Sequence, residues 1–136
     1  MTTDVLRSDE MALAVEQDIV LARQAVRKLS VEVGFSLVEQ TKMITAASEL
    51  ARNAVTYGGG GKMQSQILTD GSKKGLRLHF IDEGPGIPDI GLAMTDGWTS
   101  GGGMGLGLSG AKRLVNDFEI DSKPGEGTRV TITRWK

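Results

Sequence analysis

Apolar residues recur at helical spacing over two segments in the first half of the chain. Between residues 19 and 33 they lie three or four positions apart, which places them on one face of a helix. Gly34 follows that segment and predicts the end of the helix. Ser36 and Glu39 have the spacing of a capping box, so they predict a second helix. The second helix is expected to end near Tyr57, where four consecutive glycines begin.

Segments in which apolar and polar residues alternate predict strands in the rest of the chain. The expected strands are residues 11–16, Lys62–Thr69, Gly75–Asp82, Glu119–Ser122 and Arg129–Arg134. A turn near Asp70 joins the second strand to the third, and the turn KPGEG joins the last two. The glycine and proline content of residues 83–104 predicts a long loop, with a short helix near Ile90–Met94.

A third long helix is predicted over Leu106–Phe118. Its apolar side would consist of Leu108, Ala111, Leu114, Val115 and Phe118. This mixture of helices and strands predicts an α/β (α+β) two-layer sandwich, with helices on one face of a mixed, largely antiparallel sheet. The length of 136 residues, without repeats or a long linker, predicts a single domain over residues 1–136.

Composition and charge exclude several classes of protein. The net charge of −1 gives no electrostatic reason to expect nucleic acid or an anionic membrane as a partner. No apolar run approaches the roughly 20 residues of a membrane span, and the polar N-terminus does not read as a signal peptide. The absence of cysteine fits a reducing compartment, so a cytoplasmic protein is expected. The unusual feature is a total of 19 glycines, which gather at residues 58–61, 84–86, 101–110 and 125–127.

Asp82 is the first candidate binding residue. Alternation along its strand puts Leu78, Phe80 and Asp82 on one face. A carboxylate on an apolar face is costly unless a group donates hydrogen bonds to it. Two interpretations stay open: Asp82 caps a turn where the strand ends, or it accepts a hydrogen bond from a ligand, such as the amino group of a base. Gly84 and Gly86 would let such a ligand approach the backbone closely.

Glu49 and Asn53 form a second candidate pair, on the second predicted helix. They lie four residues apart, so they are neighbours on the helix surface, on a face roughly opposite the apolar one. Such a pair commonly belongs to a solvated face. It would also suit catalysis, because a carboxylate can take up a proton and an amide oxygen is a suitable ligand for Mg²⁺.

Glycine occupies five of the seven positions over residues 101–107, directly before the third predicted helix. The segment Gly105–Gly110 matches G-x-G-x-x-G, but no strand immediately precedes it, which argues against a dinucleotide-binding loop. The only Gly-Lys pair in the chain is followed by Met63, which excludes a P-loop. A helix N-terminus with bare glycine backbone suits a phosphate, and a flexible loop without a ligand is the alternative.

Taken in order, these motifs resemble the N, G1, G2 and G3 boxes of the GHKL ATP-binding superfamily. The boxes are Glu49-x-x-x-Asn53, Asp82-x-Gly84-x-Gly86, the glycine-rich segment 101–108, and Gly125-x-Gly127-Thr128. The resemblance covers about residues 12–135 and implies the histidine-kinase-like ATPase (Bergerat) fold. Within the superfamily the chain looks most like the anti-sigma-factor serine/threonine kinases, and among them the RsbT-type switch kinases of the stressosome. The wording IDEGPGIPDI at residues 81–90 and the final Trp135-Lys136 carry this closer likeness.

The resemblance implies a role for each candidate residue. Asp82 would accept a hydrogen bond from the adenine amino group of ATP, and the Thr128 hydroxyl would assist. Asn53 would bind Mg²⁺, which bridges the phosphates, and Glu49 would be the general base. The other nucleotide-binding positions would be Gly84, Gly86, Gly103, Gly105, Leu106 and Gly107, with the amides of Gly103, Gly105 and Gly107 holding the phosphates. Residues 87–104 would form a lid over ATP.

Two departures from the superfamily pattern narrow the implied function. Many members carry histidine four positions after the asparagine, where this chain has Tyr57. His79 lies in the middle of a predicted strand rather than on a helical hairpin, so the chain is not a complete histidine kinase. The resemblance therefore implies a kinase that phosphorylates a serine or threonine of a STAS-domain partner. It also implies that this kinase acts as a switch toward a PP2C-type phosphatase. The alternative is a nucleotide-binding anti-sigma factor or docking regulator that contacts a sigma factor, with little catalysis.

Overall fold

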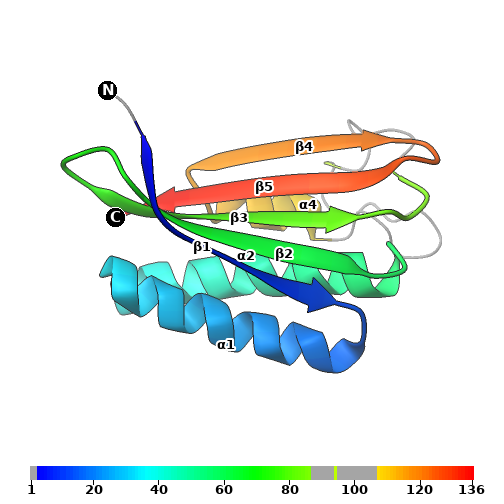
Figure 1. Ribbon diagram of the computed structural model, residues 1–136, viewed down its shortest axis with the longest axis horizontal. Helices are drawn as coiled ribbons and strands as arrows, with labels where there is room; N and C mark the ends of the chain where they lie inside the picture. The colour runs from blue at the N-terminus through cyan, green and yellow to red at the C-terminus, as the bar shows by residue number, and fades with distance from the viewer. Residues whose placement is uncertain (1–2, 87–93, 95–106) are drawn as a thin grey trace.

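A sheet and a layer of helices make up the described part of the chain (Figure 1). The computed structural model describes residues 3–86, 94 and 107–136. The elements, in chain order, are β1 (Asp4–Leu13), α1 (Glu16–Val33), α2 (Leu37–Thr56), β2 (Gly61–Thr69), β3 (Lys74–Asp82), α4 (Leu108–Arg113), β4 (Asp117–Lys123) and β5 (Gly127–Trp135). The two-layer α/β sandwich expected from the sequence is confirmed.

The five strands of the sheet have the order β1-β2-β3-β5-β4. Each neighbouring pair is antiparallel, so the sheet expected to be mixed is purely antiparallel over the described residues. The hairpin between β2 and β3 turns at Asp70, as predicted, where Asp70 Oδ1 accepts hydrogen bonds from the backbone N–H groups of Ser72 and Lys73 at 2.9 and 2.7 Å. Because β5 inserts between β3 and β4, the end of β3 lies beside the start of β5.

Side-chain and glycine caps fix the ends of the two long helices. At the start of α1 the Asp18 carboxylate accepts hydrogen bonds from two preceding backbone N–H groups, at 2.8 and 3.1 Å. Gly34 ends α1 with a left-handed φ of 92°, as expected. The predicted capping box of α2 is also confirmed, because Ser36 Oγ accepts from the Glu39 N–H at 3.1 Å and Glu39 Oε1 accepts from the Ser36 N–H at 2.9 Å.

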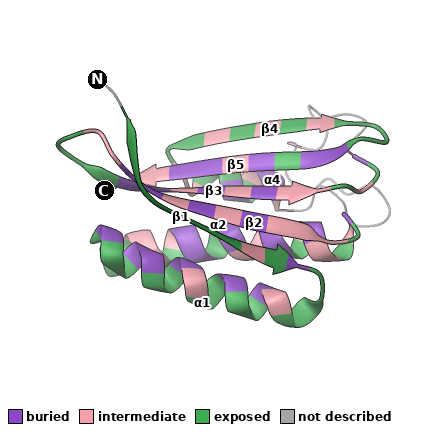
Figure 2. Ribbon diagram, in the orientation of Figure 1, coloured by how far each residue is buried: buried purple, intermediate pink, exposed green. Residues whose placement is uncertain are grey.

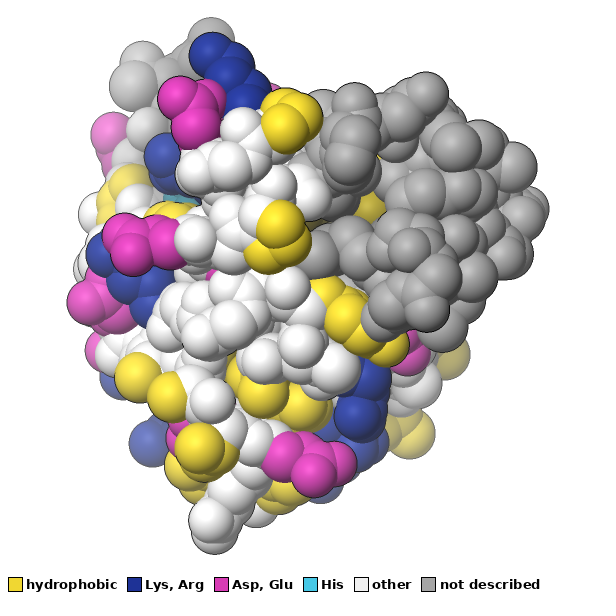
Figure 3. Space-filling view, turned by 90° about the vertical axis from the view of Figure 1, so that its right-hand side faces the viewer, with side chains coloured by type: hydrophobic (Ala, Val, Ile, Leu, Met, Phe, Trp, Pro, Cys, Tyr) yellow, Lys and Arg dark blue, Asp and Glu magenta, His cyan; other side chains and the backbone are white. Residues whose placement is uncertain are grey.

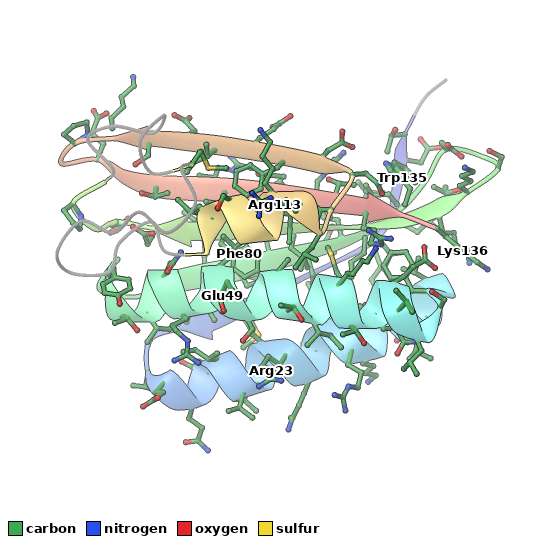
Figure 4. The ribbon with its side chains drawn as sticks, turned by 180° about the vertical axis from the view of Figure 1, so that it is seen from behind. Arg23, Glu49, Phe80, Arg113, Trp135 and Lys136 are labelled. Atoms are coloured by element: carbon green, nitrogen blue, oxygen red, sulfur yellow. The ribbon has the colours of Figure 1, made fainter. Side chains whose placement is uncertain are left out.

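The hydrophobic core lies between the sheet and the helices (Figure 2). Alternate residues of the two central strands point into this core; they are Leu76, Leu78 and Phe80 of β3, with Val130 and Ile132 of β5. Figure 4 shows all the described helices on one side of the sheet. The opposite side carries polar side chains such as Arg77, His79 and Thr131. The pleat of β3 therefore decides which of its residues face the helices and which face outward.

The first predicted strand has different bounds in the structure. β1 begins at Asp4 rather than at residue 11 and ends at Leu13, and α1 already begins at Glu16, so the strand does not continue through residues 14–16. β1 pairs with β2 from Asp4 opposite Thr69 to Leu13 opposite Gly61, with a shift in register between Val5 and Arg7. Most β1 side chains are exposed, so the sequence there lacks the alternation by which a half-buried strand is recognised.

The third long helix predicted over Leu106–Phe118 is wrong in its extent. α4 has only six residues, and the chain then turns onto the sheet. The Asn116 N–H donates to a β5 carbonyl at 2.9 Å, and the Asn116 Oδ1 accepts from a β5 N–H at 2.6 Å. Phe118 belongs to β4 and lies opposite Ile132. The short helix expected near Ile90–Met94 lies outside the described residues, apart from Met94.

Candidate nucleotide-binding site

Asp82 is the last residue of β3, at the end of the sheet where β2, β3 and β5 meet. It lies opposite Gly61 on β2 and opposite Thr128 on β5, and the pleat puts it on the same side of the sheet as Phe80. Its Oδ1 accepts a hydrogen bond from the Gly84 N–H at 2.9 Å. The strand therefore continues through Asp82, while the carboxylate also caps the turn that follows.

The Asp82 side chain is half-buried, and this burial governs its charge. Burial raises the pKa of the Asp82 carboxyl above its usual range, and hydrogen bonds from the backbone N–H groups of Gly84 and Thr128 offset part of that rise. A carboxylate that has lost part of its hydration is stabilised by each further N–H donor that reaches it. The surroundings of Asp82 therefore suit a ligand that presents an N–H donor.

The glycine motif after β3 packs on the turn between β4 and β5. The Gly125 N–H donates to the Pro85 carbonyl at 2.8 Å. Gly86 has a φ of 76°, and a Cβ built on it would overlap the backbone carbonyl of Lys123. Two glycine motifs that are distant in the sequence are thus in direct contact, and they hold the loop after Asp82 in place.

Thr128 lies beside Asp82, and its hydroxyl is held by a residue that the sequence did not single out. The Thr128 Oγ1 lies 2.8 Å from the Ser122 Oγ, and the Ser122 Oγ donates to the Gly127 carbonyl at 3.0 Å. The Ser122 hydroxyl has a single proton, which it donates to the Gly127 carbonyl. The Thr128 hydroxyl is therefore the donor in its hydrogen bond with Ser122. Ser122 stands opposite Thr128 in the β4–β5 pairing. The two residues flank the predicted turn KPGEG, and this was the signal by which the sequence could have pointed to Ser122.

Glu49 lies on the α2 surface near α4 (Figure 4). Asn53 follows one helical turn later on the same helix. Both are half-buried, so they do not belong to a fully solvated face. A Cβ built on Gly107 would lie 2.6 Å from the Glu49 Oε2, which shows that the Gly107 backbone packs directly on this carboxylate. Gly107 is the residue before α4 and has a left-handed φ of 87°. The structure thus brings the predicted base together with the end of the glycine-rich segment.

The end of α2 connects the Asn53 region to Asp82. The backbone N–H groups of Tyr57 and Gly58 donate to the Asn53 carbonyl at 3.0 and 2.9 Å. Gly58 lies against the Asp82 side chain, within the distance at which a Cβ would overlap it. The candidate residues of α2 and those of β3 and β5 therefore gather at the same end of the molecule.

Several predicted site residues are outside the described part of the chain. They are Gly103, Gly105 and Leu106, together with the expected lid over residues 87–104 except Met94, and their roles stay predictions. Among the described residues, no three His, Cys, Asp or Glu side chains gather into a metal site. Mg²⁺ does not need such a cluster, because proteins commonly hold it through one or two oxygen ligands together with substrate phosphates. Asn53 offers an oxygen of that kind.

Residues 38–136 match the family described as histidine kinase-, DNA gyrase B-, and HSP90-like ATPase. This range contains Glu49, Asn53, Asp82 and Thr128. The chain therefore belongs to this family of ATPases, as the four motifs predicted.

In the described part of the chain, no helix combines the length and the apolar composition needed to cross a membrane.

The chain is 46% identical to the serine/threonine-protein kinase RsbT of Bacillus subtilis, over 90% of this chain and 92% of that protein. It is 28% identical to the anti-sigma F factor of Thermoanaerobacter sp. (strain X514), over 90% and 89% of the two chains. A crystal structure of the RsbU and RsbW domains of Rv1364c from Mycobacterium tuberculosis has the same fold, with a TM-score of 0.67 and 22% identity. That match covers 96% of this chain and 33% of the other. The likeness to RsbT over nearly the full length of both proteins makes the chain an enzyme of the RsbT-like serine/threonine-protein kinase class.

Proposed function

We propose that the chain transfers the γ-phosphoryl group of ATP to a serine or threonine of a STAS-domain protein, in the regulation of a sigma factor. The observation that carries this proposal is the gathering of Asp82, Thr128 and the Glu49/Asn53 helix at one end of the sheet. The likeness to RsbT supports the choice of a protein hydroxyl as the acceptor. Phosphoryl transfer depends mainly on positioning and on charge neutralisation, and this end of the molecule supplies groups for both.

Asp82 is the proposed acceptor for the adenine amino group. It lies on the helix-facing side of the sheet, is half-buried, and has hydrogen bonds from Gly84 and Thr128 that hold it in one orientation. Thr128 acts mainly through its backbone N–H in this proposal, because its hydroxyl is engaged with Ser122. Gly84 and Gly86 let the loop after Asp82 pack on the backbones of Gly58 and Lys123, and this loop carries the N–H group that donates to the carboxylate. This assignment explains why a carboxylate is retained on a largely apolar face.

Glu49 is the proposed general base for the incoming hydroxyl. Its carboxylate lies against Gly107, the described end of the segment proposed to hold the phosphates. A base is effective only within hydrogen-bond reach of the proton that it removes, so it must lie near the transferred phosphoryl group. Asn53, one helical turn further along α2, is the proposed ligand of Mg²⁺. When bound, that ion would neutralise charge on the phosphates.

The single histidine of the chain is engaged elsewhere. His79 lies on the helix-free side of the sheet, with its Nδ1 at 2.9 Å from the Thr131 Oγ1 and its Nε2 at 3.3 Å from the Gln66 Oε1. Burial and two nearby arginines, Arg129 and Arg77, lower the pKa of His79. Since Asp82 faces the other side of the sheet, His79 is not placed to receive a phosphoryl group, which supports an acceptor on another protein.

The proposed consequence of phosphorylation is release of the kinase from its STAS partner and binding to a PP2C-type phosphatase. A second candidate is a nucleotide-binding regulator that docks on a sigma factor with little catalysis. The likeness to an anti-sigma F factor favours this candidate, although the shared identity is lower than with RsbT. Both candidates require ATP to bind at Asp82.

A transfer assay tests the proposed function. The protein is incubated with γ-labelled ATP, Mg²⁺ and each STAS-domain protein encoded near its gene. The proposal predicts label on a serine or threonine of one such partner. Glu49→Gln is expected to slow transfer roughly 10²- to 10⁴-fold, the contribution typical of a general base, while ATP still binds. Glu119→Gln, an exposed acid on β4, is the matched control and should transfer at the normal rate.

An ATP-bound protein that labels none of the STAS partners would reject the kinase proposal. Unchanged transfer by Glu49→Gln would reject only the assignment of Glu49 as the general base. Capture of a sigma factor by the same ATP-bound, inactive protein would favour the docking regulator instead.

A further inference from the structure

The glycine run at residues 58–61 joins α2 to β2, and the proposed chemistry assigns no role to it. Its members exclude a side chain for different reasons. Gly59 and Gly60 have φ values of 73° and 103°, so their backbone conformation itself requires glycine. Gly58 and Gly61 do not have a left-handed φ, so a side chain is excluded there by lack of space. At Gly58, the space that a side chain would need is occupied by Asp82, a candidate site residue.

Gly58 lies directly against Asp82. A Cβ built on Gly58 would come 2.5 Å from the Asp82 Cγ, 2.7 Å from its Cβ and 2.7 Å from its Oδ2. These are the nearest atoms, so the Asp82 side chain itself fills the space that a larger residue at position 58 would need. A Cβ does not approach atoms of another residue this closely, so Gly58→Ala must displace the carboxylate or the backbone.

The backbone of Gly58 is held in place from two other directions. Its N–H donates to the Asn53 carbonyl at 2.9 Å, in the last turn of α2. A Cβ built on Gly84 would lie 2.7 Å from both the Cα and the carbonyl oxygen of Gly58, so these two backbones are in contact. Gly58 is itself buried. The Asp82 Cβ is fixed by the β3 backbone, so rotation of the carboxylate relieves only part of the contact. A methyl group at position 58 must therefore displace the carboxylate and also shift the backbone at one of the two residues.

Figure 3 shows the end of the molecule where these segments meet, next to the grey residues. Much of the surface drawn there is backbone and small polar side chains, with few charged groups at its centre. Three segments place backbone around Asp82: the loop after α2 through Gly58, the loop after β3 through Gly84, and the start of β5 through Gly127. The Gly84 N–H donates to the carboxylate Oδ1 at 2.9 Å, and the Thr128 N–H at the start of β5 also donates to this carboxylate.

We propose that Gly58 is a positioning residue that sets the Asp82 carboxylate for adenine and thereby makes the site prefer ATP to nucleotides without a 6-amino group. The inference rests on the proposed ATP site. Gly58 touches neither substrate nor metal in this proposal; it acts through Asp82. The hydrogen bond from Gly84 fixes the Oδ1 side of the carboxylate, and the bare Gly58 leaves room for the Oδ2 side.

The test compares the affinity for ATP with that for inosine triphosphate, which carries an oxygen in place of the 6-amino group. Gly58→Ala is expected to lose roughly ten- to hundredfold in ATP affinity, the loss of a hydrogen bond to a charged acceptor, while the affinity for inosine triphosphate changes little. Gly59→Ala is the matched control, because it has backbone strain but meets no atom within 4 Å. It should lower stability and keep the normal ratio of the two affinities.

The ratio of affinities separates a positioning role from a general loss of structure. A folded Gly58→Ala protein with the wild-type preference for ATP would overturn the inference and leave the proposed function intact. A wild-type protein that shows no preference for ATP would instead contradict the Asp82 assignment that both proposals share.

A second comparison keeps the inference testable if Gly58→Ala does not fold. Asp82→Gly removes the three atoms that a Cβ at position 58 would meet. The inference predicts that adding Gly58→Ala to Asp82→Gly costs little further thermal stability, whereas Gly58→Ala alone costs much more. If Gly58→Ala lowered thermal stability equally in the wild type and in Asp82→Gly, the added methyl group would clash with atoms other than those of Asp82. The inference would then fail. Gly110→Ala, with no atom in reach and no left-handed φ, provides the baseline.

Discussion

The Asp82 carboxyl is the proposed acceptor for the adenine amino group, and the folded chain keeps it at a cost in stability. Burial raises its pKa, so the native protein takes up a proton at this carboxyl more readily than the unfolded chain does. The native state then binds more protons than the unfolded state over the range between the usual carboxyl pKa and the raised one. Through that range, stability falls as the pH rises. At neutral pH the charged Asp82 therefore opposes folding.

Asp82→Asn should remove this pH-dependent cost. Asparagine keeps an oxygen for the Gly84 N–H but carries no charge to be desolvated. The free energy of unfolding of the variant, minus that of the wild type, is expected to increase as the pH rises through the raised pKa and then to level off. Urea unfolding of nucleotide-free protein across that range measures the difference. A difference that stays constant, or that decreases with pH, would contradict the raised pKa.

At the residue scale, the sequence predicted the identity of the candidate groups better than their partners. Alternation over Leu78, Phe80 and Asp82 placed the carboxylate on the helix-facing side, and the structure agrees. Ser122 was missed although it and Thr128 flank the predicted turn KPGEG, because the turn indicates that the two residues are neighbours but not that their hydroxyls form a hydrogen bond. The contact of Gly58 with Asp82 was also beyond prediction, since a glycine run shows only that side chains are absent.

At the element scale, α2 carries both Glu49 and Asn53, and its first turn is fixed by the capping box of Ser36 and Glu39. The two reciprocal hydrogen bonds satisfy backbone N–H groups that have no partner within the helix. The other end of α2 leads into the contact between Gly58 and Asp82. The start of the helix is thus far from the site, and its capping can be altered without touching the proposed chemistry.

Ser36→Ala is expected to lower the free energy of unfolding by about 1 kcal/mol, the usual effect of removing an N-cap side chain. Thr45→Ala, an exposed position within α2, is the control and should be neutral or slightly stabilising, because alanine has the higher helix propensity. Chemical denaturation of the two variants and the wild type provides the measurement. Equal stability of Ser36→Ala and Thr45→Ala would show that the capping box contributes nothing.

Elements with strong local signals were predicted well, and elements decided by tertiary contacts were not. Gly34 and the capping box fix helix ends by hydrogen bonds within a few residues, so the sequence reveals them. The extent of α4 depends instead on Asn116, which bonds to β5 and starts β4. Phe118 fits either a helical or an alternating apolar pattern, and only its pairing opposite Ile132 decides between them.

At the scale of the whole molecule, the two sides of the sheet differ in their role. The helix-facing side of the sheet forms the core and ends at Asp82, while the opposite side carries His79 and other polar residues. Insertion of β5 between β3 and β4 places Thr128 next to Asp82. The order of the four motifs predicted the family correctly, and the topology brings the described parts of these motifs to one end of the sheet.

The most direct test of the central claim is the affinity for ATP of the wild type and of Asp82→Asn. An ATP analogue with a fluorophore on the ribose, which leaves the base unmodified, is titrated with each protein in the presence of Mg²⁺. The account predicts saturable binding by the wild type and an affinity roughly ten- to hundredfold lower for the variant, because a charged acceptor for the adenine amino group is lost. Equal affinity of the two folded proteins would contradict the claim that Asp82 binds the base of ATP.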